Sequence, residues 1–201
     1  YLRPGTYYVR EVDDGTHPDW TLAEAFNVTV YRGQDTYVDV TNIQNGRISV
    51  RKATNTGRDL GGWQFGIYSD AGYTTLLETM TTDDSGAAVS GYLAPGTYYV
   101  RELTDTDHPD WTFDTSGQEI TVIAGETAET TFTNRHNGRI RIVKDFPETG
   151  VEPPLSGWTF RVTDSEGKEI EGSPFTTDHS GAITTGYLAP GTYSVEEILP
   201  A

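Results

Sequence analysis

The sequence of 201 residues has no cysteine, one methionine and only three lysines, against 30 acidic residues. The lack of cysteine excludes disulfides, thiolate metal sites, cysteine nucleophiles and cysteine thioesters. The formal net charge of −16 disfavours binding to nucleic acid or to an anionic membrane surface, because like charges repel. Apolar runs are only a few residues long, so we expect neither a membrane-spanning segment nor a signal peptide.

What the sequence does contain is a long internal repeat. The block YLRPGTYYVRE at 1–11 recurs as YLAPGTYYVRE at 92–102 and as YLAPGTYSVEE at 187–197. The period is therefore about 90 residues, the size of one small domain. Other blocks recur in the same register: HPDW at 17–20 and 108–111, TNIQNGRISVRK at 41–52 and TNRHNGRIRIVK at 133–144, GWQFGIYSD at 62–70 and GWTFRVTDS at 157–165, and TTDDSGA at 81–87 and TTDHSGA at 176–182.

The repeat predicts three domains, with boundaries at the turn-forming Asn45-Gly46 and Asn137-Gly138 pairs. Only residues 46–137 form a complete repeat. Residues 1–45 correspond to the C-terminal part of an earlier repeat, and residues 138–201 to the N-terminal part of a later one. We therefore expect either that the natural chain continues on both sides, or that molecules complement one another head to tail.

Each repeat is predicted to be all-β. Short runs alternate apolar and polar residues between clusters of Gly, Pro, Asp and Asn, and no stretch has a sustained helical period. Seven short strands in one repeat suit a β-sandwich of two sheets. In the complete repeat we expect strands at 47–53, 63–69, 75–80, 86–91, 97–103, 119–124 and 128–134.

Three polar residue types recur on strand faces that otherwise carry apolar side chains. Side chains alternate with period two, so Ile48 and Val50 share a face with Lys52, and Phe132 shares one with Asn134. By the same alternation, Val38 and Val40 should face inward in the first repeat, and Val195 in the last. The recurring polar positions are Lys52 and Lys144, Glu11, Glu102 and Glu197, and Asn42 and Asn134.

These three residue types predict a self-catalysed crosslink. Burial lowers the pKa of a lysine and raises that of a glutamate, and a neutral lysine is a nucleophile. We expect the Lys52 amine to attack the side-chain amide of Asn134, while protonated Glu102 hydrogen-bonds the carbonyl oxygen and shuttles protons. Ammonia leaves and an isopeptide bond remains, once per domain and without turnover. In the alternative interpretation, Lys52 snorkels at a strand end, Glu102 pairs with it and Asn134 is a turn residue.

The order GxIxVxK, GWxFxIxxD, TTDxSG, YLxPGTYxVxE and TFTN resembles the Cna B-type domain, also called SpaA-like or prealbumin-like, of Gram-positive surface adhesins and pilins. The resemblance covers the whole chain and implies an Ig-like or prealbumin-like sandwich. It also implies the crosslink between Lys52 and Asn134 with Glu102 as catalytic group, and an extracellular stalk linked to the cell wall. The sequence departs from covalent pilus shafts, because it has neither a Tyr-Pro-Lys pilin motif nor a Leu-Pro-x-Thr-Gly sorting signal.

Other candidate sites are weaker. Trp63 and Trp158 share faces with apolar residues, which favours core packing over a carbohydrate platform, while Trp20 and Trp111 are expected to plug one end of the sandwich. The acidic loops lack calcium-loop spacing, and the histidines assemble neither a zinc site nor a catalytic triad. We expect no cofactor and no metal. The acidic loops are Asp13 and Asp14, Asp83 and Asp84, and Asp105, Asp107 and Asp110; the histidines are His17, His108, His136 and His179.

Two functions remain open. The chain is either a mechanical spacer, whose partners are the neighbouring repeats of the same chain, or an adhesive module that recognises a host protein or glycan. Loops that are nearly identical between repeats favour the spacer, because a dedicated binding site would normally mark one repeat.

Overall fold

The computed structural model describes residues 2–104, 108–146 and 154–199, and in these residues every regular element is a β-strand. The expected all-β fold is confirmed. The chain divides into two compact units. The first comprises most residues up to Phe132, and the second consists mainly of residues from Thr133 onward, together with Thr54–Gly57 and the segment around Trp111.

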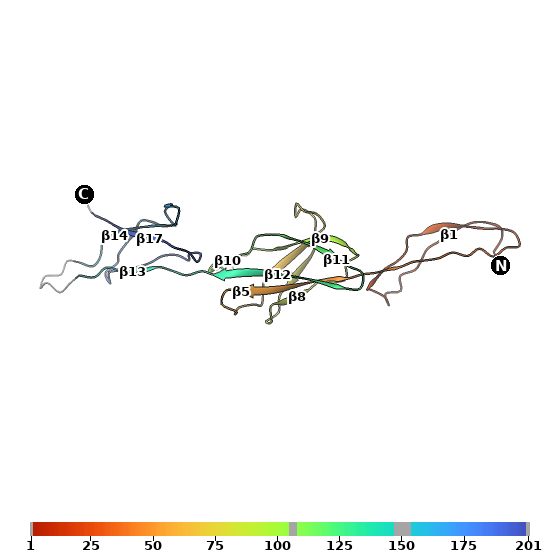
Figure 1. Ribbon diagram of the computed structural model, residues 1–201, viewed down its shortest axis with the longest axis horizontal. Coiled ribbons are helices and arrows are strands. Elements are labelled where there is room, and N and C mark those ends of the chain that lie inside the picture. The colour runs from red at the N-terminus through yellow and green to blue at the C-terminus, as the bar shows by residue number, and fades with distance from the viewer. Residues whose placement is uncertain (1, 105–107, 147–153, 200–201) are drawn as a thin grey trace. The chain divides into compact units, whose positions relative to one another are not determined.

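The central repeat contains two four-stranded sheets, and most of its strands are labelled in Figure 1. One sheet has the order β10-β12-β5-β8 and the other the order β11-β9-β6-β7. All seven strands expected here are present. The structure adds the two-residue strand β10, which was not expected. The bounds are β5 Arg47–Thr54, β6 Gln64–Tyr68, β7 Leu76–Thr81, β8 Ala87–Val89, β9 Gly96–Glu102, β10 Trp111–Thr112, β11 Gln118–Val122 and β12 Thr127–His136.

The first and last long strands of this repeat, β5 and β12, run in the same direction. The amide of Arg47 donates to the carbonyl of Glu126 at 2.9 Å, and the amide of Asn55 donates to the carbonyl of Asn134 at 3.1 Å. Residue numbers thus increase together along both strands, as parallel pairing requires. The other strand pairs of the repeat with a defined register are antiparallel.

The core of the repeat lies between the inward faces predicted from the alternation. Ile48 and Val50 on β5 and Phe132 on β12 have no exposed surface. The rings of Phe65 on β6 and Phe132 lie 5.0 Å apart, within the range of favourable aromatic pairs. This core packing fixes which side chains of β5, β9 and β12 point inward.

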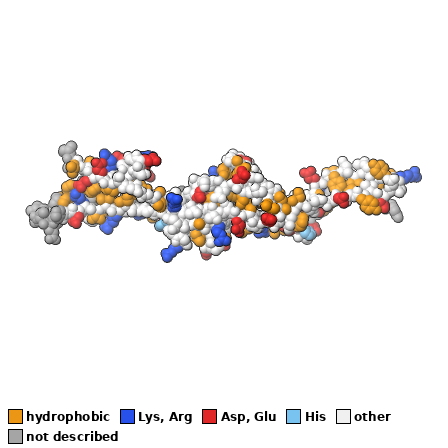
Figure 2. Space-filling view, viewed as in Figure 1, with side chains coloured by type: hydrophobic (Ala, Val, Ile, Leu, Met, Phe, Trp, Pro, Cys, Tyr) orange, Lys and Arg blue, Asp and Glu red, His pale blue; other side chains and the backbone are white. Residues whose placement is uncertain are grey.

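The N-terminal segment forms two small antiparallel pairs. Strand β1 (Gly5–Val9) pairs with β3 (Phe26–Val30), and β2 (Trp20–Thr21) pairs with β4 (Ile43–Gln44). The expectation for Val38 and Val40 was wrong: they belong to no strand and are 46% and 49% exposed. Among the described residues, no strand pairs with this stretch as β5 pairs with β12. Apolar side chains accordingly appear at the surface of this segment in Figure 2.

The C-terminal segment repeats the front half of the central repeat. Strand β13 (Arg141–Val143) pairs with β16 (Ala182–Thr184), while β14 (Thr159–Thr163) lies between β15 (Phe175–Thr176) and β17 (Ser194–Ile198). Val162 on β14 is fully buried. Val195, expected to face inward, is 46% exposed, because among the described residues β17 pairs only with β14.

Candidate functional site

The candidate site of the central repeat consists of polar side chains on inward strand faces. Lys52 lies near the end of β5 and Glu102 is the last residue of β9, and each is 2% exposed. Asn134 lies on β12 and is fully buried. The lysine, glutamate and asparagine positions predicted from the repeats are therefore all buried, which is unusual for charged and strongly polar residue types.

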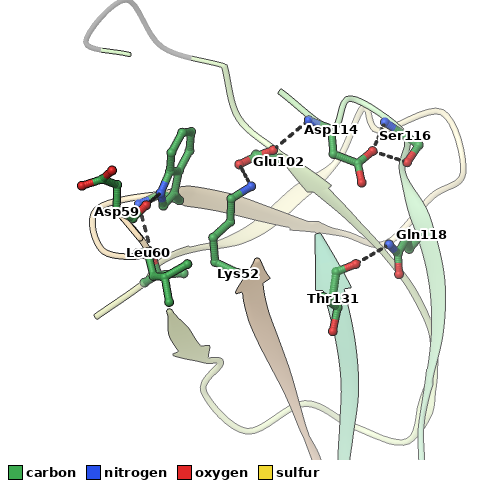
Figure 3. A network of polar contacts seen from close by, with 10 residues as sticks. Lys52, Asp59, Leu60, Glu102, Asp114, Ser116, Gln118 and Thr131 are labelled. Carbon is green, nitrogen blue, oxygen red and sulfur yellow. Dashed lines mark hydrogen bonds and ion pairs between the residues drawn. The ribbon is translucent and has the colours of Figure 1, made fainter. Parts of the chain in front are cut away.

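Lys52 and Glu102 form a close ion pair. The Lys52 Nζ donates to Glu102 Oε1 at 2.6 Å, and neither side chain is exposed to solvent (Figure 3). Aromatic rings complete the environment of the amine, since Nζ lies 4.6 Å from the centre of the Trp63 ring and 5.7 Å from that of Phe65. Trp63 is itself anchored by a 2.7 Å hydrogen bond from its indole nitrogen to the carbonyl of Asp59.

The environment makes the Lys52 amine easier to deprotonate than a lysine in water. Burial lowers the pKa of Lys52 below its ordinary value of 10.5, and the hydrogen bond and charge of Glu102 offset this only in part. The charge of Asp114 acts in the same direction as Glu102. Desolvation is the largest effect because the charged ammonium loses its hydration in the protein interior. At a given pH, a lysine whose pKa is lowered has a larger fraction of neutral amine than a lysine in water.

The second oxygen of Glu102 is held by the backbone. The amide of Asp114 donates to Glu102 Oε2 at 3.2 Å, so the carboxyl group lies between the Lys52 amine and the loop that precedes β11 (Figure 3). The Asp114 side chain closes that loop by accepting hydrogen bonds from the amide and the hydroxyl of Ser116. The loop therefore fixes the orientation of the glutamate.

Asn134 is held on the inner face of β12. It shares this face with Phe132, two residues earlier, and its backbone carbonyl accepts the hydrogen bond from the Asn55 amide. The Asn55 side chain accepts a 2.7 Å hydrogen bond from the amide of His136. Asn55 thus holds the strand at the buried asparagine and just after it.

The C-terminal segment contains the lysine and glutamate of the same site. Lys144 Nζ lies 2.9 Å and 3.0 Å from the two carboxylate oxygens of Glu197. The ring of Trp158 lies 4.2 Å from Nζ, and that of Phe146 lies 5.0 Å from it. The pair is more exposed than the central one, at 16% for the lysine and 29% for the glutamate side chain.

The N-terminal segment contains the glutamate and asparagine of the site. The Asn42 Nδ2 donates to Glu11 Oε1 at 2.8 Å, and the amide of Ala23 donates to Asn42 Oδ1 at 3.0 Å. In this segment the glutamate therefore contacts the amide nitrogen, whereas the expectation for Glu102 and Asn134 places the glutamate on the carbonyl oxygen. A backbone amide takes the oxygen instead. Ala23 and Asp114 could not be predicted from the sequence, because they donate through their backbone amides, which nearly every residue type has.

The other tryptophans and acidic positions considered from the sequence differ in their surroundings. Trp63 is buried, and Trp111 is 7% exposed with its ring 4.7 Å from that of His136, whereas Trp20 is 38% exposed. The carboxylate of Asp83 accepts hydrogen bonds from Ser85 and from the Ala87 amide, which stabilise a turn. Of the other acidic positions, Asp105 and Asp107 lie outside the described residues.

Two further searches concern metals and membranes. Within residues 2–104, 108–146 and 154–199, no group of three or more histidine, cysteine or acidic side chains is arranged to hold a metal ion. The same residues include no helix with the length and hydrophobicity needed to cross a bilayer.

Comparison with solved structures finds several bacterial proteins, among them pilins. The Bacillus anthracis TIE protein is 24% identical, with 87% of this chain and 32% of that chain covered and a TM-score of 0.44. A Streptococcal ancillary pilin is 18% identical, with 99% and 67% covered and a TM-score of 0.47. The shaft pilin SpaA from Lactobacillus rhamnosus GG is 15% identical, with 78% and 89% covered and a TM-score of 0.37. This chain thus spans about a third of the TIE protein chain.

Comparison with curated protein sequences finds no match. The family model described as "SpaA: Prealbumin-like fold domain" matches residues 46–136 and 143–200. These two segments make up most of the chain, and they contain the central Lys52 and Glu102 pair as well as Lys144 and Glu197. The protein therefore belongs to the SpaA family of prealbumin-like fold domains.

Proposed function

We propose that this chain is part of a structural stalk on the surface of a Gram-positive bacterium, in which each complete repeat is locked by an isopeptide bond. In the central repeat the bond joins Lys52 to Asn134 with the help of Glu102. The observation that carries the proposal is the buried pair of Lys52 and Glu102, 2.6 Å apart, in which burial lowers the pKa of the lysine.

A purely stabilising ion pair explains this site less well. Removing two charges from water costs several kcal/mol per ion, so a buried pair is weak evidence for a gain in stability. The same pair recurs between Lys144 and Glu197, each time beside a tryptophan ring. A reaction that uses a neutral lysine and a nearby carboxyl group explains both the burial and the recurrence.

The proposed reaction needs no cofactor. The neutral Lys52 amine forms a bond to the side-chain carbonyl carbon of Asn134, and the carbon–nitrogen bond of the amide breaks. The carboxyl group of Glu102 takes a proton from the attacking nitrogen and gives one to the leaving nitrogen, so its own protonation state is unchanged at the end. One ammonia is released and no turnover follows.

The mechanical role follows from the topology. Lys52 lies on β5 and Asn134 on β12, the first and last long strands of the central repeat. A covalent bond between these strands lets a pulling force pass through the repeat without separating its sheets. We propose the neighbouring repeats as its partners, and attachment to the cell wall through parts of the protein beyond this chain.

Intact mass spectrometry tests the proposal. The 201-residue chain should be about 17 Da lighter than its sequence, the mass of one ammonia. The Glu102→Ala variant should regain this mass, because the lysine and asparagine then lack their proton carrier. The matched control is Lys144→Met, which should keep the loss, since residues 138–201 contain no asparagine for Lys144 to attack. An unmodified parent mass would contradict the proposal.

A further inference from the structure

The backbone amide three residues after the HPDW tryptophan lies at the reaction centre of two repeats. Ala23 follows Trp20 and Asp114 follows Trp111 at this spacing. In the N-terminal segment the Ala23 amide donates to Asn42 Oδ1 at 3.0 Å. In the central repeat the Asp114 amide donates to Glu102 Oε2 at 3.2 Å. The amide at this position therefore donates to the asparagine oxygen in one repeat and to the glutamate oxygen in another.

The Ala23 contact also fixes how the asparagine amide is oriented. A backbone N–H donates only to an acceptor, so the atom of Asn42 that faces Ala23 must be the carbonyl oxygen. The amide nitrogen then faces Glu11 Oε1, at 2.8 Å. The other oxygen of Glu11 is buried and has no hydrogen-bond partner, whereas the equivalent oxygen of Glu102 receives the Asp114 amide.

We propose that this backbone amide donates the hydrogen bond that stabilises the oxyanion of the crosslinking reaction. The glutamate then carries protons between the attacking lysine nitrogen and the leaving amide nitrogen. The inference rests on the proposed function and assigns roles within the same site. In the central repeat, the Asp114 amide would move from Glu102 Oε2 to the carbonyl oxygen of Asn134 as the lysine attacks, as the Ala23 amide already does for Asn42.

With the amide on the oxygen and the glutamate on the nitrogens, the atoms and electrons of the reaction balance. As the Lys52 nitrogen bonds to the carbonyl carbon, the π electron pair moves to the Asn134 oxygen, where the Asp114 N–H stabilises the negative charge. Protonated Glu102 gives its proton to the amide nitrogen and then takes one from the attacking nitrogen. The oxygen electron pair re-forms the carbonyl group, the bond to the amide nitrogen breaks, and ammonia leaves.

The geometry of the three segments agrees with this assignment. A carboxylate oxygen of the glutamate faces the lysine nitrogen in the central repeat and the asparagine nitrogen in the N-terminal segment. In the C-terminal segment, Glu197 is again on the lysine nitrogen. A carboxyl group that contacts the attacking nitrogen in one setting and the leaving nitrogen in another is placed to carry a proton between them.

The test removes the amide hydrogen and leaves the side-chain chemistry in place. The Asp114→Pro variant has no N–H at this position, whereas Asp114→Ala keeps it and copies the residue found at position 23. A third protein carries a backbone ester at residue 114, which removes the N–H without a proline ring. Each is made by cell-free synthesis, quenched in acid at set times and weighed for the loss of about 17 Da.

We expect the proline and ester proteins to react roughly a hundredfold more slowly than Asp114→Ala, which lacks the same side chain as the proline variant but keeps the N–H. A merely structural role would instead lower stability. We therefore compare the melting temperatures of the three changes in a Lys52→Ala background, where no bond can form. There the ester protein should still fold cooperatively, melting below Asp114→Ala only by the cost of the lost hydrogen bond to Glu102, while still reacting slowly in the Lys52 protein.

The outcomes separate this inference from the proposed function. If the parent never loses ammonia, both fail. If the parent loses ammonia and the ester protein reacts as fast as Asp114→Ala, the crosslink stands and the oxyanion assignment is wrong. If the ester protein is slow only because it is unfolded in the Lys52→Ala background, the assignment is also overturned.

Discussion

The proposed bond between Lys52 and Asn134 should dominate the stability of the central repeat. The two residues are 82 positions apart (134 − 52), and joining them restricts the unfolded chain much as a disulfide does. The loop-closure relation gives about 4.5 kcal/mol at 25 °C for a loop of this length. For a domain of this size, loss of the bond should lower the Tm by roughly 20 to 30 °C.

Two variants separate the bond from the ion pair. Asn134→Ala keeps the Lys52 and Glu102 pair, which is 2.6 Å apart in the structure, but leaves the lysine no amide to attack. The double variant Lys52→Met with Glu102→Gln removes both charges and keeps similar volumes. Both should melt far below the parent in calorimetry, with their intact masses confirming that no bond has formed. Lys144→Met is the matched control and should melt with the parent.

The reasoning would be refuted by a parent that is about 17 Da light and yet melts no higher than Asn134→Ala. In that case the bond forms but does not restrict the unfolded chain. A large fall for the double variant with no fall for Asn134→Ala would instead assign the stability to the ion pair.

Three further predictions concern packing, backbone space and pH. Phe132→Ala, made in the unlinked Asn134→Ala background, should lose about 3 to 5 kcal/mol in urea unfolding, because the fully buried ring packs 5.0 Å from Phe65; a loss below about 1 kcal/mol would contradict this packing. Gly46→Ala should lower the free energy of unfolding by about 1 to 3 kcal/mol, because the added Cβ would lie 2.5 and 2.6 Å from the carbonyl oxygens of Ile123 and Glu126. Gly138→Ala is the near-neutral control in the same denaturation assay, because no atom lies within 4 Å of a Cβ at that position. In Asn134→Ala, burial lowers the pKa of Lys52 in the folded state, so the unfolded state binds more protons at pH values between that pKa and 10.5. The free energy of unfolding should therefore rise with pH in this window. If the double variant Lys52→Met with Asn134→Ala shows the same pH dependence, Lys52 is not its source.

Much of the fold follows from the sequence because strand alternation is a local property. Ile48, Val50 and Lys52 were assigned to one face from period two alone, and all three are buried. The same rule failed at Val38 and Val40, which are half-exposed. Alternation states which side chains share a face, but burial of that face depends on a partner strand. Strand β10 was missed for a related reason, since two residues are too few to show a period.

The sequence by itself determined the residue types of the site, because the lysine, glutamate and asparagine recur at matched positions of the repeats. Tertiary structure decided how the lysine and the glutamate meet. The 2.6 Å pairing of Lys52 with Glu102 joins residues 50 positions apart, and the desolvation that lowers the pKa of Lys52 arises from the packing around that pair. The amides of Ala23 and Asp114 reach the site through loop geometry. Every residue except proline carries such an amide, so only the folded backbone could show which ones face the reacting groups.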